Sequence, residues 1–592
     1  MVKEGKRKLN HRHHETLFND FARQMLLPRL ESQAGPGVSW VDLDGDGRDE
    51  LIIGTGRGGP LGAFALDEAN QWQPIPQPQQ WMAPDDTLGQ CAWHWADGTP
   101  SLLFVVSNYE TPQQPASPLW ELSLDKEGSL LVREVKGLPP AINNLRALAA
   151  ADVDNDGDLD LMIGGGIQPG RYPESATSLL LVQDQGQLKP AITQPLLPPQ
   201  GGIVQGILWS DLNSDGFPEL ILTQEWGSIC LFRNHGGTLQ PWDAPIEWTD
   251  QEGVTTSLSM HQMTGWWRGV ASGDFDEDGQ MDLVVANWGR NDQYQASLNH
   301  PLLLHSGELA RPGVTDLIEW MHDTSMGGPV TVRSFSDLRE HLPALRHFGT
   351  HAAYSQQPMK RILQTLSVHE SPREAALLDT IVLLNRGDHW EGFPLPLEAQ
   401  WSPSFSVQVG DVDNDGHQDV FLSQNFFATR PFWPRLDAGK GLWLQGDGQG
   451  RFNPMTSDRS GVRLLGEQRG AGLADYNQDG RIDLIVTQNA VETALLTNQS
   501  THAGLILSLK GPQGNPSAIG AQIRLETVMG MGPVQEVQAG SGYLSQNSLT
   551  PILGYRDRPV KVHVRWPGGK QSVHPVSLSN HPQTLQMPKA ED

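Results

Sequence analysis

Acidic side chains recur at a fixed spacing in this sequence, and that spacing suits the binding of a metal ion. The stretch VDLDGDGRDELIIG, residues 41–54, places four carboxylates within nine residues, at Asp42, Asp44, Asp46 and Glu50. Carboxylates this close repel one another unless a cation compensates their charge. Hard cations such as Ca²⁺ take about six to eight oxygen ligands, and alternate side chains of a tight loop can point to one centre. The stretch therefore predicts a cation-binding loop.

The same nine-residue frame, D-x-[DN]-x-D-G-x-x-[DE], occurs six times. Side chains at positions 1, 3, 5 and 9 can supply oxygens, and the backbone carbonyl of position 7 can face the ion. Glycine at position 6 permits the sharp turn. The predicted metal ligands are Asp42, Asp44, Asp46, Arg48 and Glu50; Asp152, Asp154, Asp156, Asp158 and Asp160; Asp211, Asn213, Asp215, Phe217 and Glu219; Asp274, Asp276, Asp278, Gln280 and Asp282; Asp411, Asp413, Asp415, His417 and Asp419; and Asp475, Asn477, Asp479, Arg481 and Asp483.

Calcium is the expected ion, with magnesium as the alternative. Mg²⁺ demands a strict octahedral geometry and keeps several waters, whereas a crowded carboxylate loop suits Ca²⁺. The chain carries 69 acidic and 42 basic residues and a formal net charge of −27. About six structural Ca²⁺ ions would offset part of this charge, so we expect their binding to be coupled to folding.

Short strands must position these loops. A strand-like run precedes each frame, and an apolar run such as LIIG or LMIGG follows it. Such runs are too short for the two helices that flank an EF-hand loop. Two further stretches, residues 93–101 and 308–316, keep the glycine of the frame, but the first keeps only Asp97 of its acids and the second only Glu308 and Asp316. We expect no metal at either of them.

The repeats predict an all-β fold built as a β-propeller. Most loops are followed by a second hairpin, which gives blades of about four strands. The repeat at Asp475 lacks a last strand, and we expect the N-terminal segment, about residues 16–30, to supply it. This count gives seven blades, with eight as the alternative if the stretch at 308 opens a blade of its own. A helical insertion is expected at about residues 314–380, where leucines recur at helical spacing.

The end of the chain predicts a small β domain. Apolar residues alternate in LILSLKG, IGAQIRLET and VKVHVRW, as in half-buried strands. The sequence GSGY, residues 540–543, is typical of a β-turn. We therefore divide the chain into a propeller, residues 1–500, and a C-terminal β domain, residues 501–592.

Composition limits the classes of partner and location. The acidic balance argues against nucleic acid, because phosphate binding needs a basic surface. No stretch of about 18 apolar residues predicts a membrane span. The basic start is not followed by an apolar segment, so no signal peptide is visible. Either the protein is cytoplasmic or its true start lies upstream of Met1.

These motifs resemble known families. The repeated frame is similar to the FG-GAP/VCBS repeats that form the propeller of integrin α chains. The segments GLILSLKGPQGNPSAIGAQIRL, VQAGSGYLSQNS and VHVRWPGGKQ, within about residues 504–571, resemble the ASPIC/UnbV domain. The pairing is similar to the cartilage acidic protein family, although TPILGYRD departs from the family's usual turn. The resemblance implies an extracellular or cell-envelope calcium-binding protein without an established enzymatic activity.

No enzyme motif is found. The sequence lacks G-x-S-x-G, HExxH and the phosphate-binding GxxxxGK[ST] motif. We therefore expect a non-enzymatic binding or adhesion-type scaffold that presents a surface to a protein or glycan. The alternative is a polysaccharide-acting enzyme that uses the propeller channel; an assembly role without a soluble ligand is a weaker third hypothesis. A plugged channel would favour the scaffold, and convergent catalytic side chains would favour the enzyme.

Overall fold

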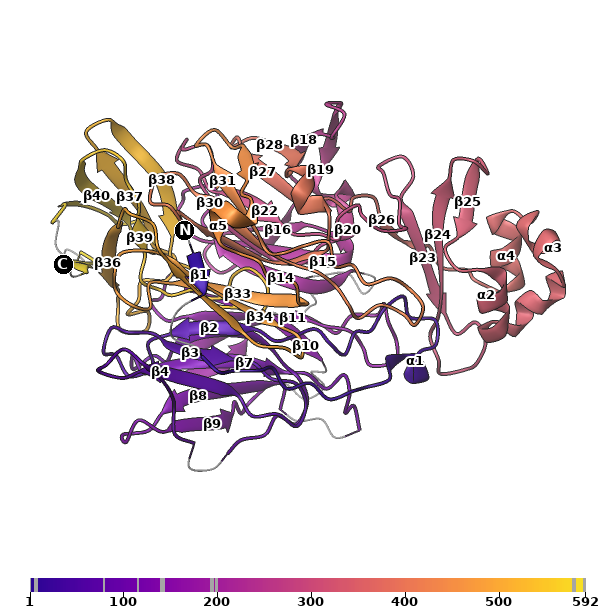
Figure 1. Ribbon diagram of the computed structural model, residues 1–592, viewed down its shortest axis with the longest axis horizontal. Coiled ribbons are helices and arrows are strands. Elements are labelled where there is room, and N and C mark those ends of the chain that lie inside the picture. The colour runs from indigo at the N-terminus through magenta and orange to yellow at the C-terminus, as the bar shows by residue number, and fades with distance from the viewer. Residues whose placement is uncertain are drawn as a thin grey trace.

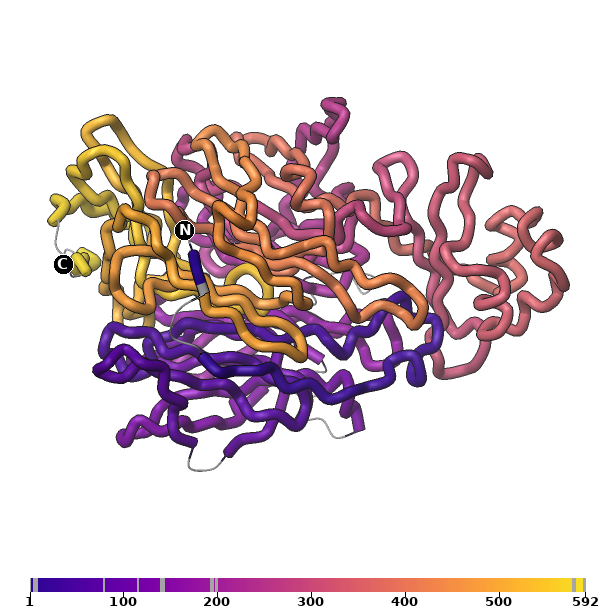
Figure 2. Tube along the Cα trace, viewed as in Figure 1, coloured from indigo at the N-terminus to yellow at the C-terminus, as the bar shows by residue number. Residues whose placement is uncertain are grey.

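A computed structural model describes residues 2–4, 9–77, 80–113, 117–138, 144–191, 196, 201–577 and 582–588. The all-β prediction is confirmed, because small antiparallel sheets make up almost the entire chain (Figure 1). In the view of Figures 1 and 2, the C-terminal strands and the α2–α4 helices lie at opposite ends of the molecule.

Seven sheets correspond to the repeats. The first contains β2 (Val38–Val41), β3 (Glu50–Ile53), β4 (Gly62–Leu66) and β5 (Trp72–Pro74). The second contains β6 (Thr87–His94), β7 (Pro100–Val106), β8 (Leu119–Leu124) and β9 (Leu130–Glu134). The third contains β10 (Leu145–Ala151), β11 (Asp160–Gly165), β12 (Leu179–Asp184) and β13 (Gln187–Pro190). The fourth contains β14 (Ile203–Ser210), β15 (Glu219–Ser228), β16 (Cys230–Asn234) and β17 (Leu239–Trp242), with β20 (Thr264–Trp266) paired to β15.

The other three sheets follow the same plan with additions. The fifth contains β21 (Val270–Gly273), β22 (Asp282–Val285), β27 (Ile381–Asn385) and β28 (Trp390–Pro394), extended by β18 (Pro245–Thr249) and β19 (Thr255–Ser259). The sixth contains β29 (Ser404–Gly410), β30 (Asp419–Gln424), β31 (Leu442–Gly446) and β32 (Phe452–Pro454). The seventh contains β33 (Gln468–Ala474), β34 (Asp483–Gln488), β35 (Ala494–Asn498) and β1 (Val2–Glu4). Short helices connect some strands: α1 (Asp20–Arg23), η1 (Met260–Gln262), η3 (Leu397–Gln400) and α5 (Ser457–Ser460).

Each acidic frame forms the turn of the first hairpin in its sheet. In all six, the acid at position 9 begins the second strand and pairs with the residue just before position 1, as Glu50 does with Val41 and Asp160 with Ala151. The apolar runs on either side form the first two strands of each sheet, and both strands are buried. The register of these hairpins therefore places all six acidic loops at the same ends of the strands.

The first strands of the seven sheets contact one another in succession. β2 contacts β6, β6 contacts β10, β10 contacts β14, β14 contacts β21, β21 contacts β29 and β29 contacts β33. β33 contacts β2, so the succession returns to its start. The core is divided between neighbouring sheets, and one cluster joins Trp40 of the first sheet to Ile485 of the seventh.

The seventh sheet takes its last strand from a different segment than expected. β1 pairs with β35, with Val2 opposite Asn498, whereas the structure places no strand within residues 16–30. That segment is coil apart from α1, and its apolar Leu26 and Leu27 are fully buried in the largest core cluster. Arg333 of the insertion donates to the carbonyls of both leucines, so this segment packs against the insertion.

The insertion differs in part from the expected helical segment. It interrupts the fifth sheet between β22 and β27 and contains a four-stranded sheet: β23 (Leu302–Gly307), β24 (Asp316–Asp323), β25 (Gly328–Thr331) and β26 (Arg373–Ala375). Helices α2 (Phe335–His341), η2 (Pro343–Phe348), α3 (His351–Ser355) and α4 (Met359–Thr365) follow β25. Part of the expected helical range is therefore strand, because the apolar run around Trp320 is buried against the core. β26 contacts β15 and β20 of the fourth sheet.

The C-terminal region forms two further sheets. One contains β36 (Leu505–Lys510), β39 (Ile552–Leu553) and β42 (Gln583–Gln586). The other contains β37 (Gln522–Thr527), β38 (Gly530–Glu536), β40 (Pro559–Arg565) and β41 (Gln571–Pro575).

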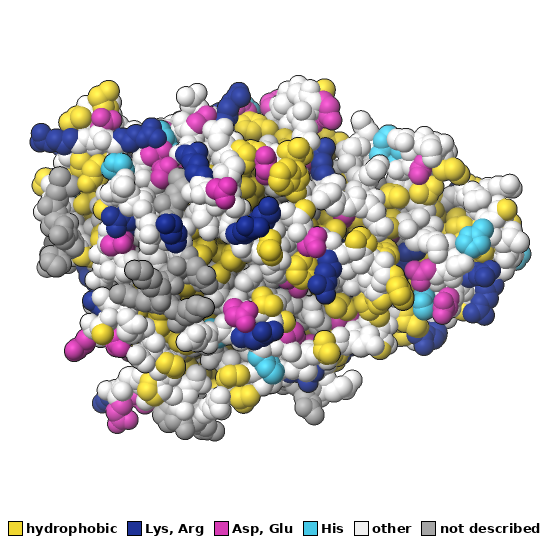
Figure 3. Space-filling model, viewed as in Figure 1, with side chains coloured by type: hydrophobic (Ala, Val, Ile, Leu, Met, Phe, Trp, Pro, Cys, Tyr) yellow, Lys and Arg dark blue, Asp and Glu magenta, His cyan; other side chains and the backbone are white. Residues whose placement is uncertain are grey.

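On the face shown in Figure 3, acidic, basic and apolar side chains are interspersed. Among the described residues, every helix is too short or too polar to cross a lipid bilayer.

Candidate metal centres

The six acidic loops share one backbone conformation. The residue at position 4 has a positive φ of 56° to 78° in every copy, and the glycine at position 6 has a φ of 78° to 95°. The position-4 residues are Gly45, Asn155, Ser214, Glu277, Asn414 and Gln478. The left-handed conformation at position 6 explains its glycine. At position 4 five non-glycine residues accept the same conformation, which the sequence did not predict.

Backbone amides hold the carboxylates in place. In all six loops the amide of the position-6 glycine donates to the position-1 carboxylate, at 2.7 to 3.1 Å. In five loops the position-9 carboxylate accepts from the amide of position 2, at 2.8 to 3.0 Å. The acids at both ends of the frame are thus fixed by the turn itself.

Oxygens in these loops fit the requirements of a hard cation. In the loops that begin at Asp42, Asp152, Asp274 and Asp411, three carboxylates each place an oxygen within 4.8 Å of the others. Several buried carboxylate oxygens lack a hydrogen-bond partner in the described structure, namely Asp152 Oδ1, Asp274 Oδ1, Asp276 Oδ1, Asp413 Oδ1, Asp479 Oδ1 and Asp483 Oδ2. Unpaired buried anionic oxygens are costly, and coordination of a cation would satisfy them.

The pKa values of the loop acids also indicate that burial disfavours their charged forms. Burial, reinforced by neighbouring acids, raises the pKa of Glu50, Asp160 and Glu219 to about 8 and that of Asp152 and Asp411 to about 7. Burial also raises the pKa of Asp274 and Asp475 to about 6. Without a cation, several of these groups would therefore retain protons near neutral pH.

Position 4 also joins neighbouring loops. Asn155 Nδ2 donates to the carbonyl of Gly216, at 3.3 Å, and Asn414 Nδ2 donates to that of Gly480, at 3.3 Å. Gln478 Nε2 donates to the carbonyl of Gly47, at 3.2 Å. Each of these acceptors is the position-6 glycine of the next acidic loop. The left-handed backbone at position 4 thus directs a side chain toward the adjacent loop.

Four arginines lie beside the loop carboxylates, and of these only Arg481 belongs to the sequence frame, at its position 7. Arg565 Nη2 lies 3.1 Å from Asp211 Oδ2, and Arg481 Nη1 lies 2.9 Å from Asp479 Oδ2. Arg386 pairs with Asp276, and Arg556 pairs with Asp415. A cation bound in these loops would share the carboxylates with the arginines. Arg386 lies in the hairpin turn between β27 and β28 and Arg556 in the C-terminal region, so only the fold brings them to the loops.

The C-terminal region docks on the same face as the acidic loops. The amide of Val534 donates to Asp274 Oδ2, at 2.9 Å, and Gln522 Nε2 donates to the carbonyl of Asp211, at 3.0 Å. Arg524 Nη2 donates to the carbonyl of Glu277, at 2.8 Å. The conformation of the acidic loops and the docking of the C-terminal region are therefore linked through these hydrogen bonds.

A segment of the C-terminal region, residues 537–549, enters the centre of the seven sheets. It forms bridges with β2 at Ser39, with β10 at Ala150 and with β21 at Val270. Gly542 has a φ of 65°, and a Cβ there would lie 2.6 Å from Gln408 Nε2. The GSGY sequence is therefore a buried central contact.

The N-terminal segment meets this loop at the centre. Tyr543 is fully buried; its hydroxyl accepts from Arg146 Nη2, at 2.8 Å, and donates to the carbonyl of Ala34, at 3.2 Å. Nearby, Arg268 Nη1 lies 2.6 Å from Glu225 Oε2, and Arg29 pairs with the other oxygen of Glu225. A hollow beside Ala34 and Arg146 has a volume of about 10 Å³, room for about one water.

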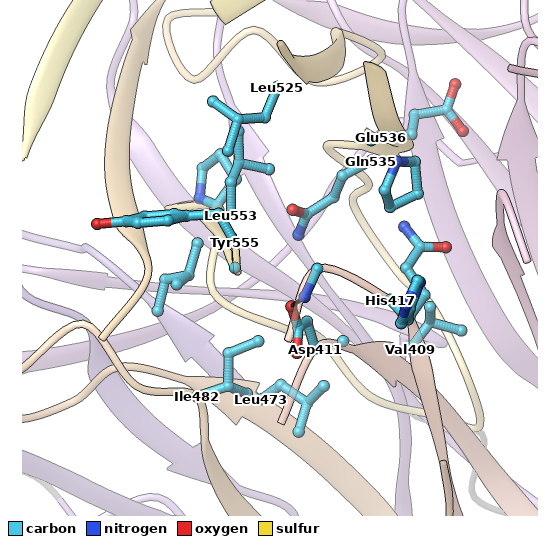
Figure 4. A pocket seen from close by; sticks show the side chains of 18 of the residues that line it. Val409, Asp411, His417, Leu473, Ile482, Leu525, Gln535, Glu536, Leu553 and Tyr555 are labelled. Atoms are coloured by element: carbon cyan, nitrogen blue, oxygen red, sulfur yellow. Dashed lines mark hydrogen bonds between the residues drawn. The ribbon is translucent and has the colours of Figure 1, made fainter. Parts of the chain in front are cut away.

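A larger cavity of about 410 Å³ lies between the sheets and the C-terminal region. In Figure 4, Leu525, Gln535, Leu553 and Tyr555 face Asp411, Leu473 and Ile482 across it. His417 also lines this space, and its Nδ1 contacts Glu277 of the neighbouring loop. Glu277, Asp411 and Asp475 all line it, so the cavity adjoins three of the candidate metal loops.

The predicted ligand sets come together in space as loops, while some predictions stay open. The position-7 residues lie in the six turns, but whether their carbonyls coordinate an ion stays a prediction. The two degenerate stretches also form hairpin turns, between β6 and β7 and between β23 and β24. In the first of them, the position-1 residue Trp93 is fully buried in the core.

Comparison with known families agrees with the repeats and the tail. A family model described as an FG-GAP-like repeat matches residues 211–285, which include two acidic loops. A second model, described as ASPIC and UnbV, matches residues 511–592. The chain contains an FG-GAP-like repeat and a C-terminal ASPIC and UnbV domain. The ASPIC and UnbV domain includes the segment that enters the centre of the sheets.

No curated protein sequence matches the chain. Among solved structures, the V. cholerae biofilm matrix protein Bap1 aligns with 12% identity and a TM-score of 0.35, covering 85% of this chain and 92% of that one. The exotype rhamnogalacturonan lyase YesX aligns with 10% identity and a TM-score of 0.27, covering 78% and 82%. Fructan 1-exohydrolase IIa from Cichorium intybus aligns with 9% identity and a TM-score of 0.27, covering 94% and 100%. Similarity at this level assigns no function.

Proposed function

We propose that this protein is a calcium-binding, non-enzymatic scaffold in which about six structural Ca²⁺ ions order one face of a closed, seven-bladed β-propeller. The ordered face carries the ASPIC and UnbV domain, and the assembly presents a surface to a protein or glycan partner. An extracellular or cell-envelope setting, which the family resemblance implies, belongs to this proposal.

One observation carries the proposal: six turns with the same backbone conformation, four of which hold unpaired buried carboxylate oxygens, lie on the face where the ASPIC and UnbV domain docks. A cation in each loop would neutralise clustered charge and fix the backbone that the domain contacts. The circular succession of contacts between first strands supports seven blades and closure.

The alternative, a polysaccharide-acting enzyme that uses the propeller channel, has less support. The centre of the sheets holds residues 537–549 from one side and the N-terminal segment from the other. The buried charges there, such as Glu225 and Arg268, are paired with each other. A filled centre favours a scaffold, because a polysaccharide needs an open groove or channel.

The metal proposal is tested by removing and restoring the ions. Protein treated with EDTA should melt at a lower temperature than native protein, and Ca²⁺ should restore stability more fully than Mg²⁺. Asp156→Ala should lower the bound calcium by about one ion per chain, because it removes a position-5 ligand. The matched control is Asp97→Ala, which changes position 5 of the degenerate stretch at 93–101.

Bound calcium is measured by elemental analysis after desalting, and melting by calorimetry. Equal calcium content in Asp156→Ala and native protein, or a melting temperature that does not respond to EDTA, would refute the proposal. Partner binding is tested separately, by comparing retention of purified glycans and proteins with Ca²⁺ and with EDTA.

A further inference from the structure

A separate group of carboxylates lies away from the six loops, at the opposite ends of the strands. Glu15 lies at the start of the N-terminal segment, Asp86 directly precedes β6, and Glu110 lies between β7 and β8. The three residues each place one oxygen within 4.8 Å of the others. No sequence frame marks this group, because its members come from three distant parts of the chain.

Burial leaves two oxygens of this group unpaired. Asp86 is 6% exposed and Glu110 is 7% exposed. Glu110 Oε1 and Glu15 Oε1 are buried, and the described structure gives neither a hydrogen-bond partner. The remaining oxygen of Glu110 accepts from Arg57 Nε, and Asp86 Oδ1 accepts from the amide of Arg57, at 2.9 Å. Arg57 therefore fixes two of the carboxylates while leaving Glu110 Oε1 free.

The charge balance of this group also favours binding of a cation. Among the residues that the structure describes, Arg57 is the one cation that forms an ion pair with the group. The adjacent Asp85 is a further acidic residue, and its Oδ2 accepts from the amides of Glu110 and Thr111. Leaving three carboxylates together without further compensation is therefore costly.

We propose that Glu15, Asp86 and Glu110 form a binding site for one hard divalent cation, Ca²⁺, which ties the N-terminal segment to the first two sheets. The donors are all oxygens, as Ca²⁺ prefers, and bound water would complete the coordination. The site is independent of the six loops and would remain if their proposed role failed.

The test uses the full-length protein and Tb³⁺ as a probe for the calcium position. Crystals soaked in TbCl₃ should show an anomalous peak between Glu15, Asp86 and Glu110. In solution, Glu15→Gln should lower bound calcium by about one ion per chain and reduce the gain in melting temperature that Ca²⁺ gives. Glu127→Gln, an exposed change in the turn between β8 and β9, is the matched control and should alter neither value.

Two outcomes would overturn the proposal. One is the absence of a peak at this group in crystals whose six loops hold Tb³⁺. The other is a Glu15→Gln variant that melts higher than native protein by the same amount in Ca²⁺ and in EDTA. That result would mean that protons shared between the carboxylates, and not a bound cation, relieve their repulsion. The soak of unaltered protein decides the question even if the variant folds poorly.

Discussion

At the scale of residues, the acidic loops keep ionisable groups in surroundings that disfavour their charge. The raised pKa values of Glu50, Asp160 and Asp411 follow from burial and from nearby acids. A carboxyl group whose pKa is raised by folding stabilises the folded state while protonated. That contribution is present below the unfolded pKa of about 4 and is lost as the pH rises through the folded values.

We therefore predict that the ion-free protein loses stability as the pH rises from about 5 to 8, since the folded pKa values of the loop acids lie at about 6 to 8. Saturating Ca²⁺ should remove most of this decline, because it favours the ionised form. Calorimetry across this range with EDTA and with Ca²⁺ measures both curves. An ion-free protein whose melting temperature rises over this interval would contradict the prediction.

The sequence predicted the carboxylates well because their identity and spacing are local. It missed the left-handed conformation at position 4, where only Gly45 and the two asparagines are residues that commonly adopt it. It also missed the arginines that come from outside the frame, because Arg565, for example, reaches Asp211 only after the C-terminal domain docks.

At the scale of elements, alternation and turn residues were enough to place the hairpins. The acid at position 9 begins a strand in every loop, as the apolar run after it predicted. The closing strand was misplaced because three residues, Val2 to Glu4, carry too little pattern to be recognised. The strands inside the insertion were hidden by the stronger helical signal that follows them.

We predict that Val2→Asp weakens the seventh sheet. Val2 is 1% exposed and pairs with Asn498, so the change removes apolar burial and places a charge against the core. A loss of about 2 kcal/mol in local stability corresponds to roughly 30-fold faster amide hydrogen exchange in β35. Exchange followed by mass spectrometry measures this change.

Lys3→Asp is the control on the same strand, because Lys3 is exposed. Amides of β7, in the second sheet, should keep their protection in both variants. Unchanged exchange in β35 of the Val2 variant would mean that β1 does not hold this edge in solution.

At the scale of the whole molecule, segments from the N-terminal and C-terminal parts of the sequence meet among the first strands of the seven sheets. Tyr543 joins Arg146 of the third sheet to Ala34 of the N-terminal segment. Pattern within the tail predicted its strands correctly as a small β domain, but not its entry into the sheets. Such contacts depend on shape and on residues hundreds of positions apart, which local periodicity does not record.

We predict that Tyr543→Ala uncouples the C-terminal domain from the sheets. Truncating a fully buried aromatic side chain costs about 3 to 5 kcal/mol, here at a contact shared by several sheets. Calorimetry should then resolve two transitions. Tyr543→Phe keeps the ring and should lose only about 1 kcal/mol with the hydroxyl contacts. A Tyr543→Ala protein with an unchanged single transition would contradict this account.

The pairing of Val2 with Asn498 has a consequence for synthesis on the ribosome. Val2 leaves the exit tunnel hundreds of residues before its partner Asn498 is made, and Ala150 likewise must wait for Ala539. Contacts of such long sequence separation form slowly, and unfinished sheets expose edges that aggregate. We therefore expect newly made chains to depend on chaperone protection until the ASPIC and UnbV domain has been translated.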